Sequence, residues 1–337
     1  MASALPRIPT PLGFIRSHSA PLVIDEAQLA PELFNVIQVE SERVGTPGQY
    51  ILSGSRNFIL KQQISQSLAG RVGMLTLLPL SYRELRGTKD RISFDDYLHR
   101  DGYPRLYNVD IPEAVYYSNY VTTYLDRDAS GLINASSLNQ FNLFLRIAAT
   151  NAGQLTNVAS MASDVGVSVN TLRAWLSILE QSYIVFLLQL CFVNSRKCLV
   201  KTPKLYFYDT GLLRYLLSGG STLEMERAGS LGPVFENAVI AERYKHYLNS
   251  GQSPELYFYR DSNGVEVDLV DLTDRPMPAL YEVKSSRTFR SSFMSHLNSV
   301  GGLLGVEPAG RSVIMRSDRT TEVNGSRVWS VSDWACR

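Results

Sequence analysis

The chain has 337 residues, 45% of them hydrophobic, which is enough for two or three domains with cores of their own. Its 33 lysines and arginines almost balance its 32 aspartates and glutamates, and the net charge of +1 excludes a uniformly basic surface. Any affinity for nucleic acid must therefore come from local patches.

Three cysteines without a Cys-x-x-Cys spacing favour a reducing compartment. The most apolar run, residues 183–193, is too short to cross a bilayer, and the N-terminus lacks the apolar segment of a secretory signal. We therefore expect a cytoplasmic protein with no membrane partner.

The first predicted elements are short apolar strands that end in polar side chains. Residues 22–24 form a strand that ends at Asp25 and Glu26, and an amphipathic helix is expected after Pro31. A second strand, residues 49–55, ends in small polar side chains. A third strand is expected at residues 74–78, and it leads into a helix with a capping box of Ser81 and Glu84.

This succession resembles a family of prokaryotic AAA-type ATPases, in which the Walker B strand ends in Asp-Glu and the sensor strand ends in Thr/Ser-Gly-Ser. The resemblance implies that Asp25 belongs to the ligand sphere of Mg²⁺ and that Glu26 polarises the attacking water. It further implies that Ser53 or Ser55 senses the γ-phosphate, and that Arg71 in a Leu-Ala-Gly-Arg stretch contacts phosphate.

The phosphate-binding loop of such ATPases, Gly-x-x-x-x-Gly-Lys-Ser/Thr, has no counterpart, since no Gly-Lys dipeptide occurs in the sequence. The strand–loop–helix unit that carries this loop takes about 30 residues or more. Residues 1–21 are too few to supply it. We therefore expect an ATPase core that is N-terminally incomplete. ATP is the cofactor of intact relatives, but we expect this chain to bind and hydrolyse it poorly.

A helical region follows. A cap of Ser93 and Asp96 predicts the start of a helix, and Pro112 starts a longer one. Three further helices are predicted at residues 138–149, 155–164 and 169–181. Gly166 in a tight turn and Ser168 as a cap predict that the last two helices form a helix-turn-helix. Strands at residues 183–190 and 204–208 are expected to form a wing.

Two interpretations of this winged helix stay open. Its third helix offers Arg173 as the single cation, so it either reads a DNA groove or serves as a packing scaffold. The segment that follows either contacts a phosphate backbone or is a solvated loop; its basic residues are Arg196, Lys197, Lys201 and Lys204. Asp209 is expected to cap the helix after it, within a block at residues 200–213 that also resembles the ATPase family.

The densest chemistry lies at residues 264–286, where two alternating strands joined by a turn predict a hairpin. Alternation places Asp268 on one strand and Glu282 with Lys284 on the same face of its neighbour. Two carboxylates beside an ammonium group favour a divalent metal ion, and the lysine would orient a water or stabilise charge on a phosphate. The alternative is an exposed strand with solvated charges.

With its neighbours, this hairpin resembles the PD-(D/E)xK nuclease-like superfamily, in the form of a C-terminal domain of unknown function that many prokaryotic AAA-type ATPases carry. The resemblance implies that Glu236 on a helix joins Asp268, Glu282 and Lys284 in one catalytic site. It implies that Asp268 and Glu282 hold Mg²⁺ or Mn²⁺. The neighbouring elements are predicted at residues 232–240, 256–260, 292–300, 311–315 and 328–331.

The predicted fold is therefore α/β in three parts. Residues 1–90 form a partial P-loop ATPase sheet, 91–215 a helical linker and winged helix, and 216–337 a restriction-endonuclease-like domain. The leading hypothesis is an incomplete AAA-type ATPase with a nuclease-like domain and a nucleic-acid or protein partner. The alternatives are a metal-dependent nuclease that works without ATP and a catalytically silent module that binds protein or DNA. The sequence determines neither the substrate nor the oligomeric state.

Overall fold

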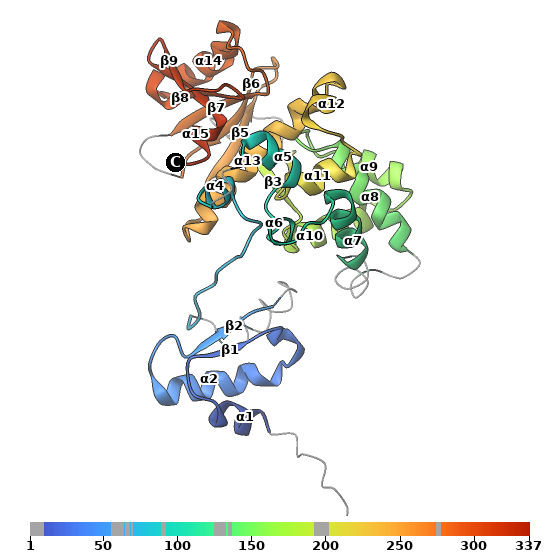
Figure 1. Cartoon of the computed structure of the whole chain (residues 1–337), viewed down its shortest axis with the longest axis vertical. Coiled ribbons are helices and arrows are strands. Elements are labelled where there is room, and N and C mark those ends of the chain that lie inside the picture. The colour runs from blue at the N-terminus through green and yellow to red at the C-terminus, as the bar shows by residue number, and fades with distance from the viewer. Residues whose placement is uncertain are drawn as a thin grey trace, which may run out of the picture. The chain divides into compact units, whose positions relative to one another are not determined.

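The structure is a computed structural model that describes residues 10–54, 64, 68, 70–88, 92–124, 133, 137–191, 202–273 and 278–337 (Figure 1). The chain divides into two compact units, Met1–Leu75 and Thr76–Arg337. Among the described residues, no helix combines the length and the hydropathy that a membrane span requires.

The N-terminal unit contains a small parallel sheet covered by helices. Strands β1 (Leu22–Ile24) and β2 (Tyr50–Leu52) pair in register, with Val23 opposite Ile51. The helical elements are α1 (Pro11–Ser17), η1 (Ala27–Leu29) and α2 (Glu32–Val44). The buried side chains Leu33, Phe34 and Ile37 of α2 form the centre of the core. Both strands and the helix after Pro31 confirm the prediction.

The third strand predicted at residues 74–78 is wrong. Residues 72–78 carry no regular secondary structure, and the side chains of Leu75 and Leu77 are 87% and 96% exposed. A strand forms only where a neighbour takes up its backbone hydrogen bonds. In the part of the N-terminal unit that is described, the sheet consists of β1 and β2 alone, so the apolar pattern of residues 74–78 finds no neighbouring strand.

The C-terminal unit begins with helices whose ends follow the predicted caps. Ser81 and Ser93 both form capping boxes, with Glu84 and Asp96. The helices up to the sheet are α4 (Tyr82–Arg86), α5 (Phe94–Arg100), α6 (Arg105–Asn108), α7 (Glu113–Tyr124), α8 (Leu138–Thr150), α9 (Val158–Val165) and α10 (Val169–Gln181). Gly166 ends α9 with a φ of 77°, and the Ser168 hydroxyl caps α10.

An eight-stranded mixed sheet forms the centre of the C-terminal unit (Figure 1), in the order β4-β3-β5-β6-β7-β8-β10-β9. The strands are β3 (Val185–Leu190), β4 (Lys204–Phe207), β5 (Leu256–Arg260), β6 (Glu266–Asp271), β7 (Ala279–Lys284), β8 (Arg311–Met315), β9 (Thr321–Val323) and β10 (Ser326–Ser330). Strand β6 runs antiparallel to both of its neighbours, β5 and β7, whereas β7, β8 and β10 are parallel. The predicted hairpin of β6 and β7 is confirmed.

The remaining helices pack against this sheet. Helix α13 (Leu231–Asn249) contacts β4 and β7, and α14 (Ser295–Leu304) contacts β6, β7 and β8. They belong to different hydrophobic clusters, since α13 packs with Tyr281 and Val283 while α14 packs with Leu280 and Val313. The other elements are α11 (Thr210–Leu216), α12 (Thr222–Arg227), η4 (Ser291–Met294), η5 (Pro308–Gly310) and α15 (Val331–Trp334).

The two strands predicted as the wing of a winged helix have a further role. They pair antiparallel as β3 and β4, and β3 then pairs with β5 in parallel through Gln189 and Leu190. The hairpin therefore forms one end of the same sheet that holds the acidic residues of β6 and β7. This pairing brings β4 against α13, on which Glu236 lies.

Candidate functional site

Four residues singled out from the sequence come together in the C-terminal unit. Glu236 lies in the second turn of α13, Asp268 on β6, and Glu282 with Lys284 near the end of β7. The Lys284 ammonium lies 2.6 Å from Glu282 Oε1 and 4.0 Å from Asp268 Oδ2. The charges of both Asp268 and Glu236 act on Glu282, so the three carboxylates share one electrostatic environment.

An irregularity in the sheet accompanies this arrangement. The pairing of β5 with β6 shifts register between Tyr257 and Tyr259, opposite the stretch of β6 that contains Asp268. Such bulges commonly re-aim side chains beside functional sites. The pairing of β6 with β7 ends at Leu269, and the Val283 N–H donates to Asp268 Oδ2 at 2.8 Å. The Asp268 carboxylate is therefore fixed by the backbone of the strand that carries Glu282.

Burial sets the protonation of this cluster. Burial raises the pKa of Glu282 to about 7, and the charge of Asp268 raises it in the same direction while Lys284 opposes it. Burial likewise raises the pKa of Glu236 to about 7, with Asp268 adding to the shift and Lys204 opposing it. Near neutral pH, Glu236 and Glu282 therefore bind protons in part, unless a cation replaces those protons.

Two residues of the cluster were not predicted as site residues. The buried Lys204 Nζ lies 3.4 Å from Glu236 Oε1 and 2.5 Å from Glu266 Oε1, and the Tyr206 hydroxyl donates to Glu236 Oε1 at 2.7 Å. The sequence placed Lys204 in a segment that is either solvated or bound to phosphate. The solvated interpretation is wrong for this residue, because Lys204 is buried on β4, and the phosphate contact stays a prediction. The rest of that basic segment lies outside the described residues.

A signal for these two residues was present in the sequence. Lys204 and Tyr206 are two positions apart on a predicted strand and therefore point the same way. The pattern could not show that the strand lies against α13, because that contact depends on the pairing of β3 with β5.

The oxygen atoms of the cluster suit a hard divalent cation. Glu282 Oε2 is buried, and no hydrogen-bond partner for it is found among the described residues. Mg²⁺ commonly binds through one or two carboxylates and completes its coordination with waters and substrate phosphate. Asp268 and Glu282 fit that mode. A closed cage does not fit, since the described residues contain no group of three or more His, Cys, Asp or Glu side chains placed to hold a metal ion.

Three of the residues predicted for a nucleotide site, Asp25, Glu26 and Ser53, lie close together in the N-terminal unit. Asp25 follows β1 and Ser53 follows β2, and the ends of parallel strands meet at one edge of a sheet. The Ser53 hydroxyl donates to the Asp25 carboxylate, and the Glu26 N–H donates to the same oxygen at 3.0 Å. Glu26 has a φ of 49° and accepts a hydrogen bond from the Gln28 amide.

The other two predicted residues of that site differ in their placement. Arg71 forms an ion pair with Glu42 of α2 at 2.8 Å, and both side chains are about half exposed. This ion pair joins Arg71 to a helix of the unit. Ser55 lies outside the described residues.

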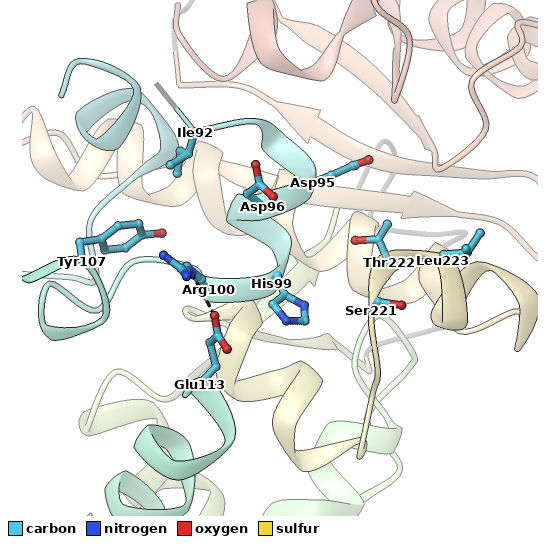
Figure 2. A pocket seen from close by; sticks show the side chains of 10 residues that line it. All are labelled: Ile92, Asp95, Asp96, His99, Arg100, Tyr107, Glu113, Ser221, Thr222 and Leu223. Atoms are coloured by element: carbon cyan, nitrogen blue, oxygen red, sulfur yellow. Dashed lines mark hydrogen bonds and ion pairs between the residues drawn. The ribbon is translucent and has the colours of Figure 1, made fainter. Parts of the chain in front are cut away.

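A separate polar pocket of about 690 Å³ lies elsewhere in the C-terminal unit (Figure 2). Figure 2 shows an ion pair across it, from Arg100 of α5 to Glu113 of α7, at 2.9 Å. Its other lining residues are Ile92, Asp95, Asp96, His99, Tyr107, Ser221, Thr222 and Leu223. None of the residues that the sequence predicted as site residues lines this pocket.

Comparison with known proteins matches three successive regions. Residues 5–86 match a family described as AAA domain, residues 91–223 match the domain of unknown function DUF8612, and residues 231–334 match the domain of unknown function DUF4143. The chain therefore contains a region that matches an AAA domain, followed by two regions that match domains of unknown function. The resemblance to AAA-type proteins is confirmed at this level, and none of the three families is named as a nuclease.

The relatives in these comparisons are themselves uncharacterized. Proteins of Mycobacterium tuberculosis and Mycobacterium bovis are each 32% identical over 290 residues, which covers 84% of this chain and 62% of the relative. A protein of Haemophilus influenzae is 24% identical over 212 residues, covering 58% of this chain and 52% of the relative. The chain thus spans less than two thirds of the length of these curated relatives. No solved structure matches it.

Proposed function

We propose that the C-terminal unit carries a Mg²⁺- or Mn²⁺-dependent nuclease site formed by Glu236, Asp268, Glu282 and Lys284. The observation that supports it most is the buried Glu282 Oε2, for which the described part of the chain offers no hydrogen-bond partner. This oxygen lies in a cluster of three acids and a lysine. A buried polar atom without a partner is costly unless something binds it.

Each residue of the proposed site would have its own role. A divalent metal ion, when bound, would lower the pKa of a water and stabilise charge on a phosphate. Asp268 and Glu282 would hold it, with Asp268 fixed by the Val283 N–H. Lys284 is about one third exposed, so its ammonium can reach a water or a phosphate oxygen while it neutralises Glu282. Glu236 would be positioned by the Tyr206 hydroxyl.

Plasmid nicking and the cleavage of short single-stranded DNA and RNA in Mn²⁺ would test this proposal. We expect cleavage by the wild-type protein and its loss in Asp268→Asn and Lys284→Met, each by about 100-fold or more. Glu322→Gln, at an exposed position on β9, is the matched control and should cleave like wild type. Wild-type protein that cleaves none of these substrates, or variants that cleave equally well, would contradict the assignment.

The other parts of the leading hypothesis are also proposals. We propose that Asp25, Glu26 and Ser53 belong to a nucleotide site, supported by the hydrogen bond between Asp25 and Ser53 and by the AAA domain match. The division at residues 1–90, 91–215 and 216–337 stays a prediction.

For the helical region, a packing scaffold is the candidate role that the structure favours over a reader of DNA. Helices α9 and α10 have the turn and cap of a helix-turn-helix, but Leu172, Trp175 and Leu176 of α10 are buried. Their burial favours a scaffold over a groove reader, with Arg173 as the single basic residue of α10. A fluorescence anisotropy titration with duplex DNA distinguishes the two roles. If α10 is a scaffold, Arg173→Ala should bind duplex DNA no more weakly than the wild-type protein does.

A further inference from the structure

A buried lysine enters the acidic cluster from outside the hairpin that defines it. Lys204 lies on β4, in the region that matches DUF8612, whereas the acids lie in the region that matches DUF4143. Its ammonium group lies between Glu236 and Glu266 and 5.4 Å from the centre of the Phe258 ring. The Lys204 ammonium group is thus held among carboxylates by β4, which pairs with β3 in the sheet.

The charges of the cluster can be counted from these contacts. Four carboxylates, Glu236, Glu266, Asp268 and Glu282, are paired with three cationic side chains. These cations are Lys204, Lys284 and Arg260, the last with its guanidinium 3.1 Å from Glu266. With every group ionised, one negative charge stays unbalanced. One divalent ion and one phosphodiester would make the whole group neutral, whereas a second divalent ion would leave it strongly positive.

We propose that Lys204 takes the place of a second divalent cation, so that the site binds a single Mg²⁺ or Mn²⁺ ion at Asp268 and Glu282. This inference rests on the proposed nuclease site. Many phosphodiesterases use two metal ions about 4 Å apart to stabilise the attacking and leaving oxygens. Here Glu236 and Glu266, the carboxylates available for a second ion, are already bound to the ammonium group.

The surroundings keep Lys204 in its charged form. Burial alone would lower its pKa, but the charges of Glu236, Asp268 and Glu266 raise the pKa to about 12. Tyr206, two residues along β4, holds Glu236 from the same strand. Strand β4 therefore supplies both a fixed charge and the orientation of one acid.

The number of Mn²⁺ ions bound per chain tests this inference. It is measured by titrating the full chain with Mn²⁺, followed by calorimetry and by electron paramagnetic resonance of free Mn²⁺. We expect wild-type protein to bind one Mn²⁺ per chain. Lys204→Met removes the charge with little change in length, and we expect it to bind a second Mn²⁺ at Glu236 and Glu266. Lys204→Gln serves the same purpose if the Met variant does not fold.

Two controls keep the positive charge and should stay at one ion. Lys204→Arg retains a cation, and Tyr206→Phe removes only the hydrogen bond to Glu236. Two ions in the wild-type protein, or one ion in folded Lys204→Met or Lys204→Gln, would overturn the inference while leaving a metal-dependent nuclease in place. Wild-type protein that binds no Mn²⁺ would instead remove the proposed function together with the inference.

Discussion

The two units of the chain both place acidic residues on the strands of a sheet or at their ends, but they surround them differently. Asp25 at the end of β1 is exposed, and its carboxylate accepts hydrogen bonds from Ser53 and from the next backbone amide. Asp268 and Glu282 are buried between a helix and two strands, and burial raises the pKa of Glu282. The same residue type thus acquires unusual chemistry only where several elements exclude water from it.

The sheets themselves differ in the same way. In the N-terminal unit, Val23 and Ile51 lie opposite each other on β1 and β2, and they are 63% and 57% exposed. In the C-terminal sheet, α13 and α14 cover different sets of apolar side chains, and Leu269 and Leu280 are fully buried. The comparison predicts that removing a charged side chain lowers the free energy of unfolding much more in the C-terminal unit than in the N-terminal unit.

The largest expected effect is at Lys245, which is fully buried in α13. Its ammonium lies 3.0 Å from Asp101, 3.3 Å from Glu242 and 2.8 Å from the Tyr97 hydroxyl. Lys245→Met leaves buried carboxylates without their cation, which costs about 3–5 kcal/mol of unfolding free energy. Urea unfolding followed by tryptophan fluorescence measures it, since Trp175, Trp329 and Trp334 all lie in this unit.

The matched substitution in the N-terminal unit is Arg16→Ala. Arg16 pairs with Glu40, but its own side chain is more than half exposed. Glu40 is buried, but it also pairs with Arg43 at 2.9 Å, so its carboxylate keeps a cationic partner when the exposed Arg16 is removed. All three tryptophans lie in the other unit, so urea unfolding of the N-terminal unit is followed by far-UV circular dichroism. We expect Arg16→Ala to shift its midpoint far less than Lys245→Met shifts the tryptophan midpoint, and an equal shift would end the contrast between the units.

The next effect concerns metal binding by the two acidic sites. A ligand that binds only the folded protein stabilises it by about 2.7 kcal/mol at 100 times its Kd. We expect Mn²⁺ to raise the melting temperature of the tryptophan-containing unit in the wild type and in Asp25→Asn, but not in Asp268→Asn. Thermal unfolding with and without MnCl₂ measures this. Loss of the shift in Asp25→Asn alone would place the metal in the N-terminal unit instead.

A pH effect is expected at Asp209, whose side chain caps α11 and is buried beside Asp101. Burial raises the pKa of Asp209 to about 8, the charge of Asp101 raises it further, and Lys245 opposes both. The unfolded chain releases this proton near pH 4, whereas the folded chain keeps it up to about pH 8. The free energy of unfolding should therefore fall as the pH rises through this window.

Asp209→Asn has no carboxyl group to titrate. Its free energy of unfolding should fall less than that of wild type between about pH 5 and pH 8, because each pH unit in that window lowers the wild-type value by up to about 1.4 kcal/mol. Urea unfolding at several pH values measures the difference, with the exposed Asp318→Asn as control. Parallel pH profiles for wild type and Asp209→Asn would show that the raised pKa has no effect on stability.

The smallest expected effect is nucleotide binding by the N-terminal unit. The 337-residue chain contains no Gly-Lys dipeptide, and the lysine and loop amides supply most of the phosphate binding in P-loop proteins. We expect no measurable heat of ATP binding in calorimetry at micromolar protein, in wild type and in Asp25→Asn alike. Micromolar affinity in the wild-type chain would contradict this expectation.

Local patterns predicted most of the elements correctly. The alternation in β6 and β7, the caps at Ser81, Ser93 and Ser168, and the cap by Asp209 all agree with the structure. These signals depend on neighbours in the chain, so they are readable from the sequence. The strand expected at residues 74–78 failed because an apolar stretch becomes a strand only where another strand pairs with it.

The sequence alone singled out four candidate site residues: Asp268, Glu282 and Lys284 through the alternation of two strands, and Glu236 through the family resemblance. The tertiary structure alone decided that Lys204 and Tyr206 belong with them, and that Arg71 pairs with Glu42. The physical reason is that pairing between β3 and β5 joins residues almost 70 positions apart. A contact of that kind depends on the packing of the whole sheet, and no local pattern records it.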